Sequence, residues 1–200
     1  MKKFDFTKQL PTHLSDRYEK EYFLIFSIIV AGRNAKMATE KTWELLKWVS
    51  PDETPFQYLQ FQYPQGQSFL QGQSLICLLK KTKIGQYNRI KRAIQDAITL
   101  DVETCTLEDL LDCYGIGNKT ARFFLLNVRK DVEYAALDTH ILKWVDHHLG
   151  RFMDIPNSTP TNNTLYKKIE YNAIKLMKKY FPDLTLAQAD FEIWKQYAKG

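Results

Sequence analysis

The chain contains 200 residues with a formal net charge of +5 at pH 7, and 44% of the residues are hydrophobic and 26% charged. These values belong to the ordinary globular class and leave room for one large domain or two small ones. A membrane span is excluded, because the longest nearly apolar run, residues 23–31, is too short to cross a bilayer and the N-terminus lacks the apolar core of a signal peptide. We therefore expect a cytoplasmic protein with no membrane partner.

The first third of the chain predicts two helices followed by a long loop. Apolar residues recur at helical spacing from Asp16 to Ala31, and again over residues 35–49, with a polar break at residues 32–34 between them. Residues 51–74 are rich in glutamine and aromatic side chains without a clean helical or strand period. We expect a long loop with short helical turns there.

The middle of the chain predicts a helix and then a helical hairpin. A basic turn at residues 83–86 precedes a strongly helical apolar pattern over residues 87–98. Thr106 and Asp109 have the spacing of a capping box, which starts a short helix. Gly115-Ile116-Gly117 then forms a tight turn, and a second helix starts near Asn118.

The last third of the chain predicts three more helices. Asp138 occupies the N-cap position of a helix that Gly150 closes, and loop residues rich in Pro, Asn and Thr follow at 153–163. One further helix stops before Pro182, and another follows Thr185. Since no segment has a convincing strand pattern, we predict an all-α protein.

Basic side chains gather in two stretches that contain no acid. Residues 78–94 and residues 113–130 together carry Lys80, Lys81, Lys83, Arg89, Lys91, Arg92, Lys119, Arg122, Arg129 and Lys130. Such a gathering is a typical electrostatic footprint for nucleic acid, although solvated helix faces give the same pattern.

The three cysteines, Cys77, Cys105 and Cys113, are scattered and odd in number. They form no C-x-x-C pair, so they indicate neither a disulfide framework nor a cysteine-ligated cluster. We expect reduced thiols, no metal site and no cofactor. The adjacent His147 and His148 point in different directions on a helix and imply no metal either.

The hairpin turn carries the first indication of function. Two glycines around an isoleucine let the backbone turn sharply and leave free amides at the start of the second helix, where a phosphate oxygen binds readily. With Lys119, Arg122 and Lys130 nearby, the expected anion is a nucleic-acid backbone.

The segment Gly115-Ile116-Gly117-Asn118-Lys119-Thr120-Ala121, followed by Leu137-Asp138-Thr139-His140, resembles the helix-hairpin-helix and downstream aspartate of the DNA glycosylase superfamily that includes endonuclease III. Residues 83–89 resemble the loop before that hairpin. Phe124-Leu125-Leu126-Asn127-Val128 leading into Ala136-Leu137-Asp138 is similar to the small archaeal-type 8-oxoguanine glycosylases. The resemblance covers about residues 20–150.

The resemblance implies a catalytic pair. Lys119 would attack the anomeric carbon of the sugar, expel the base and form a Schiff base that undergoes β-elimination, and Asp138 would orient the nucleophile and stabilise positive charge on the sugar. An amine attacks only when it is neutral, which burial and the positive end of a helix favour. Taken singly, Lys119 could be a phosphate contact and Asp138 only an N-cap.

The resemblance also implies roles in binding. The hairpin residues Gly115, Ile116, Gly117, Asn118 and Thr120 would hold the DNA backbone, together with Asn88 and Arg89. Gln86 would fill the gap that a flipped-out base leaves. Arg33, Asn34 and Trp194 are candidates for the base pocket, although Asn34 could be a helix cap and Trp194 a core residue. His140 is a candidate ligand or acid, although a histidine beside an N-cap is more often a hydrogen-bonded structural residue, which is our interpretation.

Together these features predict two helical lobes with an active-site cleft between them. Residues 24–136 would form a helical barrel lobe with the helix-hairpin-helix at 106–129, and residues 1–23 plus 137–200 the second lobe. The chain lacks the C-terminal four-cysteine cluster of the endonuclease III branch, which favours the cluster-free 8-oxoguanine branch.

The predicted function is a monomeric, bifunctional DNA glycosylase and AP lyase of base excision repair. It would remove an oxidised base, 8-oxoguanine, from damaged double-stranded DNA in the cytoplasm, associated with the nucleoid when bound. The alternatives are an oxidised-pyrimidine glycosylase and a helix-hairpin-helix DNA-binding protein without catalysis.

Overall fold

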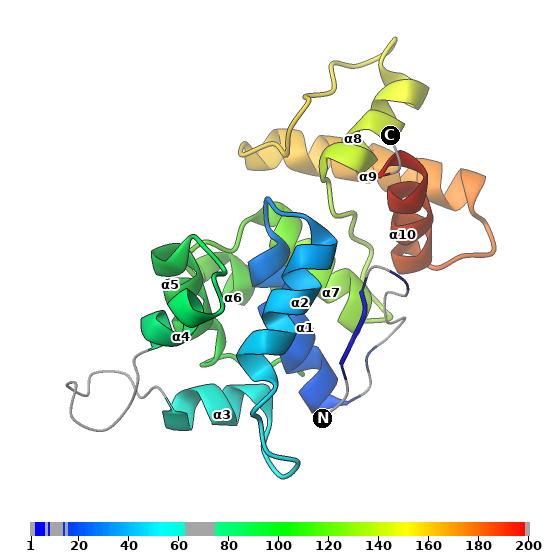
Figure 1. The fold of residues 1–200 in the computed structure, drawn as a ribbon. Coiled ribbons are helices and arrows are strands. Elements are labelled where there is room, and N and C mark those ends of the chain that lie inside the picture. The colour runs from blue at the N-terminus through cyan, green and yellow to red at the C-terminus, as the bar shows by residue number, and fades with distance from the viewer. Residues whose placement is uncertain (1–2, 7, 9–13, 15, 63–74, 199–200) are drawn as a thin grey trace. The chain divides into compact units, whose positions relative to one another are not determined.

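The computed structural model describes residues 3–6, 8, 14, 16–62 and 75–198, and within these ranges all regular structure is helical (Figure 1). This confirms the prediction of an all-α protein. The helices in chain order are α1 (Arg17–Val30), α2 (Ala35–Leu46), α3 (Pro55–Gln62), α4 (Leu75–Lys81), α5 (Tyr87–Ala97), α6 (Leu107–Asp112), α7 (Asn118–Val128), α8 (Thr139–Leu149), α9 (Asn163–Tyr180) and α10 (Leu186–Tyr197).

The chain divides into two compact units, Met1–Ile116 and Gly117–Gly200. The first unit contains α1 to α6 and the second contains α7 to α10. We predicted one lobe from residues 24–136, a second lobe from residues 1–23 plus 137–200, and a cleft between them. These boundaries and the cleft stay predictions. None of the helices in the described ranges has both the length and the apolar character of a membrane span.

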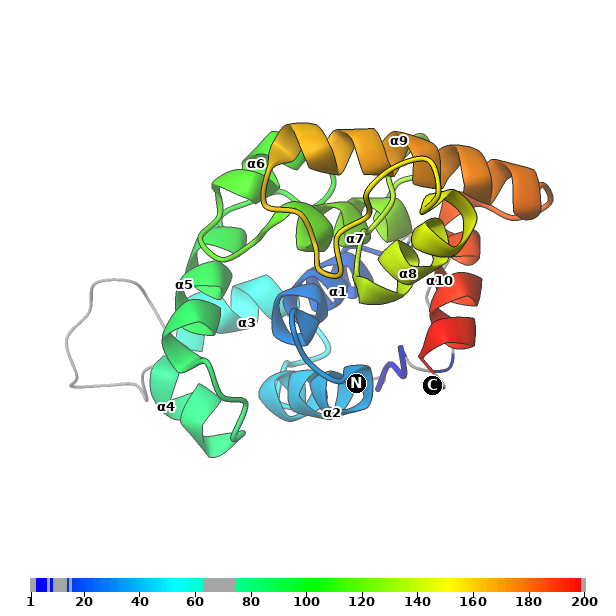
Figure 2. The ribbon, with the colours of Figure 1, turned by 90° about the horizontal axis from the view of Figure 1, so that it is seen from above.

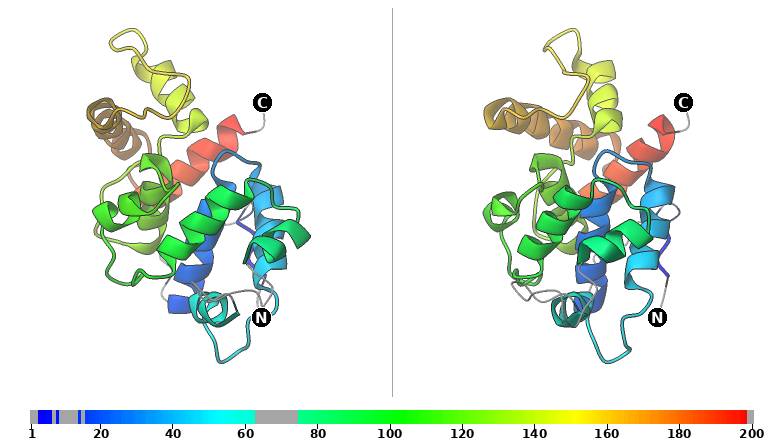
Figure 3. Two further views of the ribbon diagram at one scale, coloured as in Figure 1. Left: turned by 90° about the vertical axis from the view of Figure 1, so that its left-hand side faces the viewer. Right: turned by 60° about the vertical axis from the view of Figure 1, so that its left-hand side comes forward.

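The first unit is built around α1. Its residues from Tyr22 to Ile29 are buried on every side, as expected for a helix that is apolar all round. It packs against α2, α3 and α5, and Figure 3 shows α1 in blue between the light blue α2 and the green α5. The predicted helix at residues 16–31 is confirmed by α1.

Helix α3 replaces the long loop predicted for residues 51–74, so that prediction was wrong for residues 55–62. Thr54 and Gln57 form reciprocal hydrogen bonds of 2.9 and 3.3 Å that cap the helix start, and Pro55 suits the first helical position. Only eight residues long, α3 is too short to display a helical period among its glutamines. Helix α4, with seven residues, was also missed because it is too short to display a helical period. The glutamine-rich residues 63–74 lie outside the described residues.

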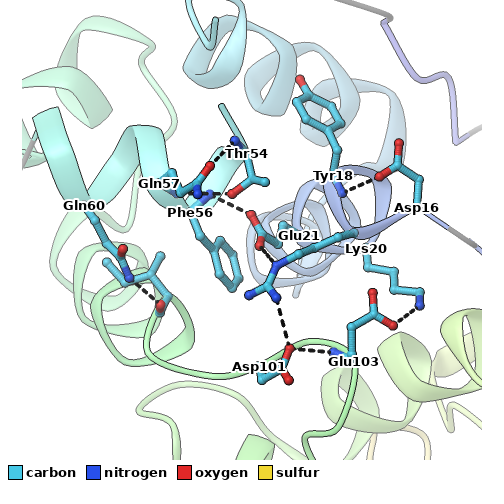
Figure 4. A network of polar contacts seen from close by, with 12 residues as sticks. Asp16, Tyr18, Lys20, Glu21, Thr54, Phe56, Gln57, Gln60, Asp101 and Glu103 are labelled. Carbon is cyan, nitrogen blue, oxygen red and sulfur yellow. Dashed lines mark hydrogen bonds and ion pairs between the residues drawn. The ribbon is translucent and has the colours of Figure 1, made fainter. Parts of the chain in front are cut away.

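A fully buried carboxylate joins α1 to α3 (Figure 4). Glu21 accepts a hydrogen bond of 2.9 Å from the Arg17 guanidinium and another of 2.9 Å from the Phe56 amide. Arg17 also pairs with Asp101 at 3.5 Å. This network lies wholly within the first unit.

Helices α8, α9 and α10 pack on one another and form the core of the second unit (Figure 2). Its buried residues include Leu137, Ile141, Leu142, Val145, Tyr166, Ile169, Ala173, Met177 and Ile193. Apart from Leu137, which precedes α8, these residues lie on the three C-terminal helices that the sequence predicts. Because Leu137 belongs to this core, the start of α8 at Asp138 is fixed relative to α9 and α10.

Candidate active site

The turn between α6 and α7 has the geometry that two glycines allow. Gly115 has a φ of +74°, and a Cβ added there would lie 3.0 Å from Cγ of Arg89. Gly117 is the N-cap of α7 and provides no side chain to the free amides of the first turn. Ile116 between them is buried. The predicted start of α7 at Asn118 is confirmed, and its uncapped amides meet the requirement for an anion site.

Lys119 lies in the first turn of α7 and is half-buried. Its Nζ lies 4.4 Å from the centroid of the Phe123 ring, one helical turn further on. Since a cation is attracted to the face of an aromatic ring, Phe123 helps to hold the lysine side chain in place.

Asp138 is the N-cap of α8, as the sequence predicts. Its Oδ1 accepts hydrogen bonds of 2.9 Å from the amides of His140 and Ile141, so the same oxygen makes both capping bonds. The carboxylate is therefore held in one orientation at the positive end of a helix.

Asp190 on α10 is the third ionisable residue of this cluster, and it is not among the site residues that we predicted from the sequence. Its side chain is buried, accepts a hydrogen bond from the Ala136 amide and leaves Oδ2 with no partner in the structure. Burial and, to a lesser extent, the charge of Asp138 raise the pKa of Asp190, while Lys119 and the Ala136 amide lower it, and the net result is a pKa of about 8. The interaction of Asp190 with both charges brings Lys119 and Asp138 into one electrostatic cluster of the second unit.

One signal in the sequence points to Asp190. It lies four residues after Leu186 and three before Ile193, on the apolar stripe of α10. A carboxyl group among positions that are otherwise apolar is costly to bury, and it therefore indicates a functional site.

His140 and Trp194 lie beside this cluster. The His140 ring meets the Trp194 ring edge-on at a centroid distance of 6.4 Å, and Trp194 stacks on Phe191 at 5.9 Å. The buried Nδ1 of His140 has no hydrogen-bond partner in the structure. We expected the ring of His140 to be hydrogen-bonded, and for Nδ1 this expectation was wrong. Trp194 follows Asp190 by one helical turn, so both side chains leave α10 on the same side.

Arg122 does not face a phosphate, contrary to the sequence prediction. Only 1% of it is exposed, and its Nε donates a 2.8 Å hydrogen bond to Oε1 of Glu170 on α9. A partner 48 residues away gives no signal in the local sequence. The basic character of residues 113–130 therefore owes less to Arg122 than the sequence suggests.

A second group of predicted residues lies in the first unit. The Arg89 guanidinium donates hydrogen bonds to Oε1 of Gln86 at 2.6 Å, to the Gly115 carbonyl at 3.3 Å and to the Ile28 carbonyl at 3.0 Å. Burial lowers the pKa of Arg89, and the nearby charge of Arg33 lowers it further. Arg89 thus ties the turn before α5 to the hairpin turn and to the end of α1.

The remaining predicted residues of the first unit also have local roles. Arg33 donates to the Ile84 carbonyl, and Oδ1 of Asn34 caps α2 by accepting from the amides of Lys36 and Met37 at 2.9 and 3.2 Å. Asn88 is exposed in the first turn of α5. Gln86 precedes α5 in the left-handed conformation, with a φ of 45°, and its side chain is exposed apart from the bond to Arg89.

Potential metal ligands do not gather anywhere in the described part of the chain, since no group of three His, Cys, Asp or Glu side chains could hold an ion there. The cluster around Lys119 contains one amine and two carboxyl groups.

No protein-family model matches the sequence, and no curated protein does so either. Among solved structures, the chain shares the fold of a glycosylase/lyase. That structure is the 8-oxoguanine glycosylase/lyase of Methanocaldococcus jannaschii in complex with a 15mer DNA containing 8-oxoguanine. It matches with a TM-score of 0.64 and 20% sequence identity, over 99% of this chain and 87% of the other. The likeness shows a common fold, as the resemblance of residues 114–142 led us to expect.

Proposed function

We propose that the protein is a bifunctional DNA glycosylase and AP lyase that removes an oxidised base, 8-oxoguanine, from double-stranded DNA. One observation carries the proposal: the charges of Lys119 and Asp138 both affect the pKa of the buried Asp190, within a fold shared with an 8-oxoguanine glycosylase/lyase. Covalent catalysis at a sugar carbon requires a nucleophilic amine and a carboxylate, and Lys119 and Asp138 supply these groups from the starts of α7 and α8.

The chemistry follows from these groups. The neutral amine of Lys119 forms a bond to C1′ of the sugar, while the bond from C1′ to the base breaks and its electron pair leaves with the base, which takes up a proton. The sugar ring then opens to give a Schiff base between C1′ and Lys119. Loss of a proton from C2′ breaks the C3′–O bond, so that the 3′ phosphate leaves, and water finally releases the lysine.

The two carboxyl groups have different roles. Because its pKa is raised to about 8, Asp190 carries a proton at neutral pH, and we assign the role of the reacting carboxylate to Asp138. Asp138 then stabilises the positive charge that develops on the sugar. Its fixed orientation as an N-cap means that the carboxylate needs no rearrangement during the reaction.

Binding to DNA is assigned to residues of both units. The amides around Gly115, Ile116, Gly117, Asn118 and Thr120 would contact the phosphate backbone. Gln86 and Asn88 would enter or flank the gap in the duplex beside Arg89. Arg33, Asn34 and Trp194 remain the candidates for the base pocket, and we propose that the protein acts as a cytoplasmic monomer.

Borohydride trapping tests the proposal. Wild-type protein incubated with a duplex that contains one 8-oxoguanine should form a covalent adduct, because borohydride reduces the Schiff base. Lys119→Gln should form none, and Asp138→Asn should form it far more slowly. Lys175→Gln, at an exposed position on α9, serves as the matched control. An adduct that persists in Lys119→Gln would exclude the assigned nucleophile.

The same assay separates the alternatives. Trapping on a duplex with an oxidised pyrimidine, and none with 8-oxoguanine, would indicate the oxidised-pyrimidine glycosylase. Retained affinity for duplex DNA without an adduct on any lesion would indicate a helix-hairpin-helix binding protein.

A further inference from the structure

A buried ion pair joins the start of α7 to α9. The Arg122 guanidinium donates to Oε1 of Glu170 at 2.8 Å and to Oδ1 of Asn118 at 2.6 Å, and it lies 4.4 Å from the centroid of the Tyr166 ring. The side chain of Arg122 is 1% exposed and that of Glu170 is 9% exposed. Asn118 immediately precedes Lys119, so this pair fixes the backbone from which the lysine emerges.

The same network holds the segment that leads into Asp138. Oε1 of Glu170 accepts a hydrogen bond of 3.1 Å from the Ala135 amide. The Tyr166 hydroxyl accepts a 3.0 Å bond from the Leu137 amide and donates a 3.0 Å bond to the Ala135 carbonyl. Residues 135–137 are buried and lie outside the helices. The bonds from Glu170 and Tyr166 satisfy backbone groups of this segment that no helix pairs.

We propose that Arg122, Glu170 and Tyr166 form a positioning network that sets the distance and angle between Lys119 and Asp138. None of the three is assigned a contact with DNA. They act through Asn118 on one side and through residues 135–137 on the other. This inference rests on the proposed function of the Lys119–Asp138 pair.

The energetics of burial support a positioning role over simple stabilisation. A buried ion pair must overcome the loss of hydration of both charges, and well-packed apolar residues of similar volume often stabilise a fold as much or more. Unlike apolar contacts, the hydrogen bonds of the ion pair fix the position of particular atoms. Arg122 bonds to Asn118, next to Lys119, and Glu170 bonds to Ala135, in the segment that leads to Asp138. Burial raises the pKa of Glu170, whereas the Ala135 amide and Arg122 lower it, so its charge depends on these partners.

Glu21 offers a matched control in the first unit. Like Glu170, it is a buried carboxylate that accepts one hydrogen bond from an arginine and one from a backbone amide, those of Arg17 and Phe56 (Figure 4). Glu21→Gln therefore breaks a similar network that has no link to Lys119 or Asp138. Tyr166→Phe is the milder test variant, since it removes one hydroxyl and leaves the ion pair in place.

The experiment measures single-turnover excision, adduct trapping and affinity for an 8-oxoguanine duplex, at a temperature well below the melting point of every variant. A misplacement of about 1 Å costs on the order of 100-fold in rate. We therefore expect Glu170→Gln and Tyr166→Phe to excise about 10- to 100-fold more slowly, with nearly unchanged affinity for the duplex. Glu21→Gln should melt at a lower temperature yet retain the wild-type rate.

Amide hydrogen exchange provides a measurement that does not depend on activity. Exchange at residues 135–141 should accelerate in Tyr166→Phe and not in Glu21→Gln. Wild-type rates in both Glu170→Gln and Tyr166→Phe, or equal losses in Glu21→Gln, would overturn the positioning network. If the wild type traps no adduct, the proposed function fails, and the exchange measurement alone then decides whether the network holds residues 135–138.

Discussion

Replacing Asp190 by asparagine should change how the stability of the protein depends on pH. The side chains have nearly equal volume, so packing is retained while the titrating group is removed. In the folded protein the pKa of Asp190 is raised to about 8, whereas an aspartate in an unfolded chain titrates near pH ~3.9. Between these two values the folded state holds a proton that the unfolded state has lost.

The sign and size of the effect follow from this difference. The stabilisation by Asp190 is complete below about pH 4 and is lost as the pH rises toward 8, at about 1.4 kcal/mol per pH unit. From pH 5 to pH 7 the free energy of unfolding of the wild type should therefore fall by about 3 kcal/mol relative to that of Asp190→Asn. The other titrating groups are common to both proteins, so the difference between the two curves isolates this site.

Urea unfolding at pH 5, 6, 7 and 8 measures the effect. The slope of the free energy against urea should be the same in both proteins, which shows that the unfolded states are comparable. Asp183→Asn, at an exposed position before α10, is the control and should run parallel to the wild type. Parallel curves for wild type and Asp190→Asn would refute the assignment of a buried, protonated carboxyl group.

Three further outcomes are expected. Gly115→Ala should lower the free energy of unfolding by about 1 kcal/mol or more, since an L-residue is strained at φ +74° and its Cβ would contact Arg89. Gly117→Ala, with no atom within 4 Å, should cost less, since only the N-cap preference of α7 is affected, and equal melting temperatures of the two variants would contradict this. Asn34→Ala should cost about 1 kcal/mol in thermal unfolding through loss of the α2 cap, and Asn34→Asp should retain the cap. Affinity for undamaged duplex should fall as salt rises, because phosphate contacts release counterions, and a flat dependence in a filter-binding titration would argue against a basic DNA-binding face.

Most helices that the sequence predicted correctly have several apolar turns, whereas the short α6 was predicted from its capping box. In α5 the buried positions are Ile90, Ala93, Ile94 and Ala97, and α8 shows the same regularity with Asp138 at its start. Helix α3, with eight residues, was missed because two helical turns hold too few apolar positions to establish a period.

The candidate site could be predicted only where its residues follow a local pattern. Lys119 and Asp138 lie at helix starts that capping and glycine signals mark. Asp190 and Glu170 act through contacts with distant segments, and only folding brings them to α7 and α8. The burial of Arg122 was mispredicted for the same reason, since its charge is neutralised by a residue on another helix.

The capping bonds of Asp138 restrict what can replace it. Asparagine would keep the start of α8 but not the negative charge, and glutamate would keep the charge but lose the short reach that the two amides require. Alanine would lose both. Under the proposed function, Asp138→Asn would therefore give a well-folded protein that binds damaged DNA without cutting it, and such a protein would shield lesions from other enzymes.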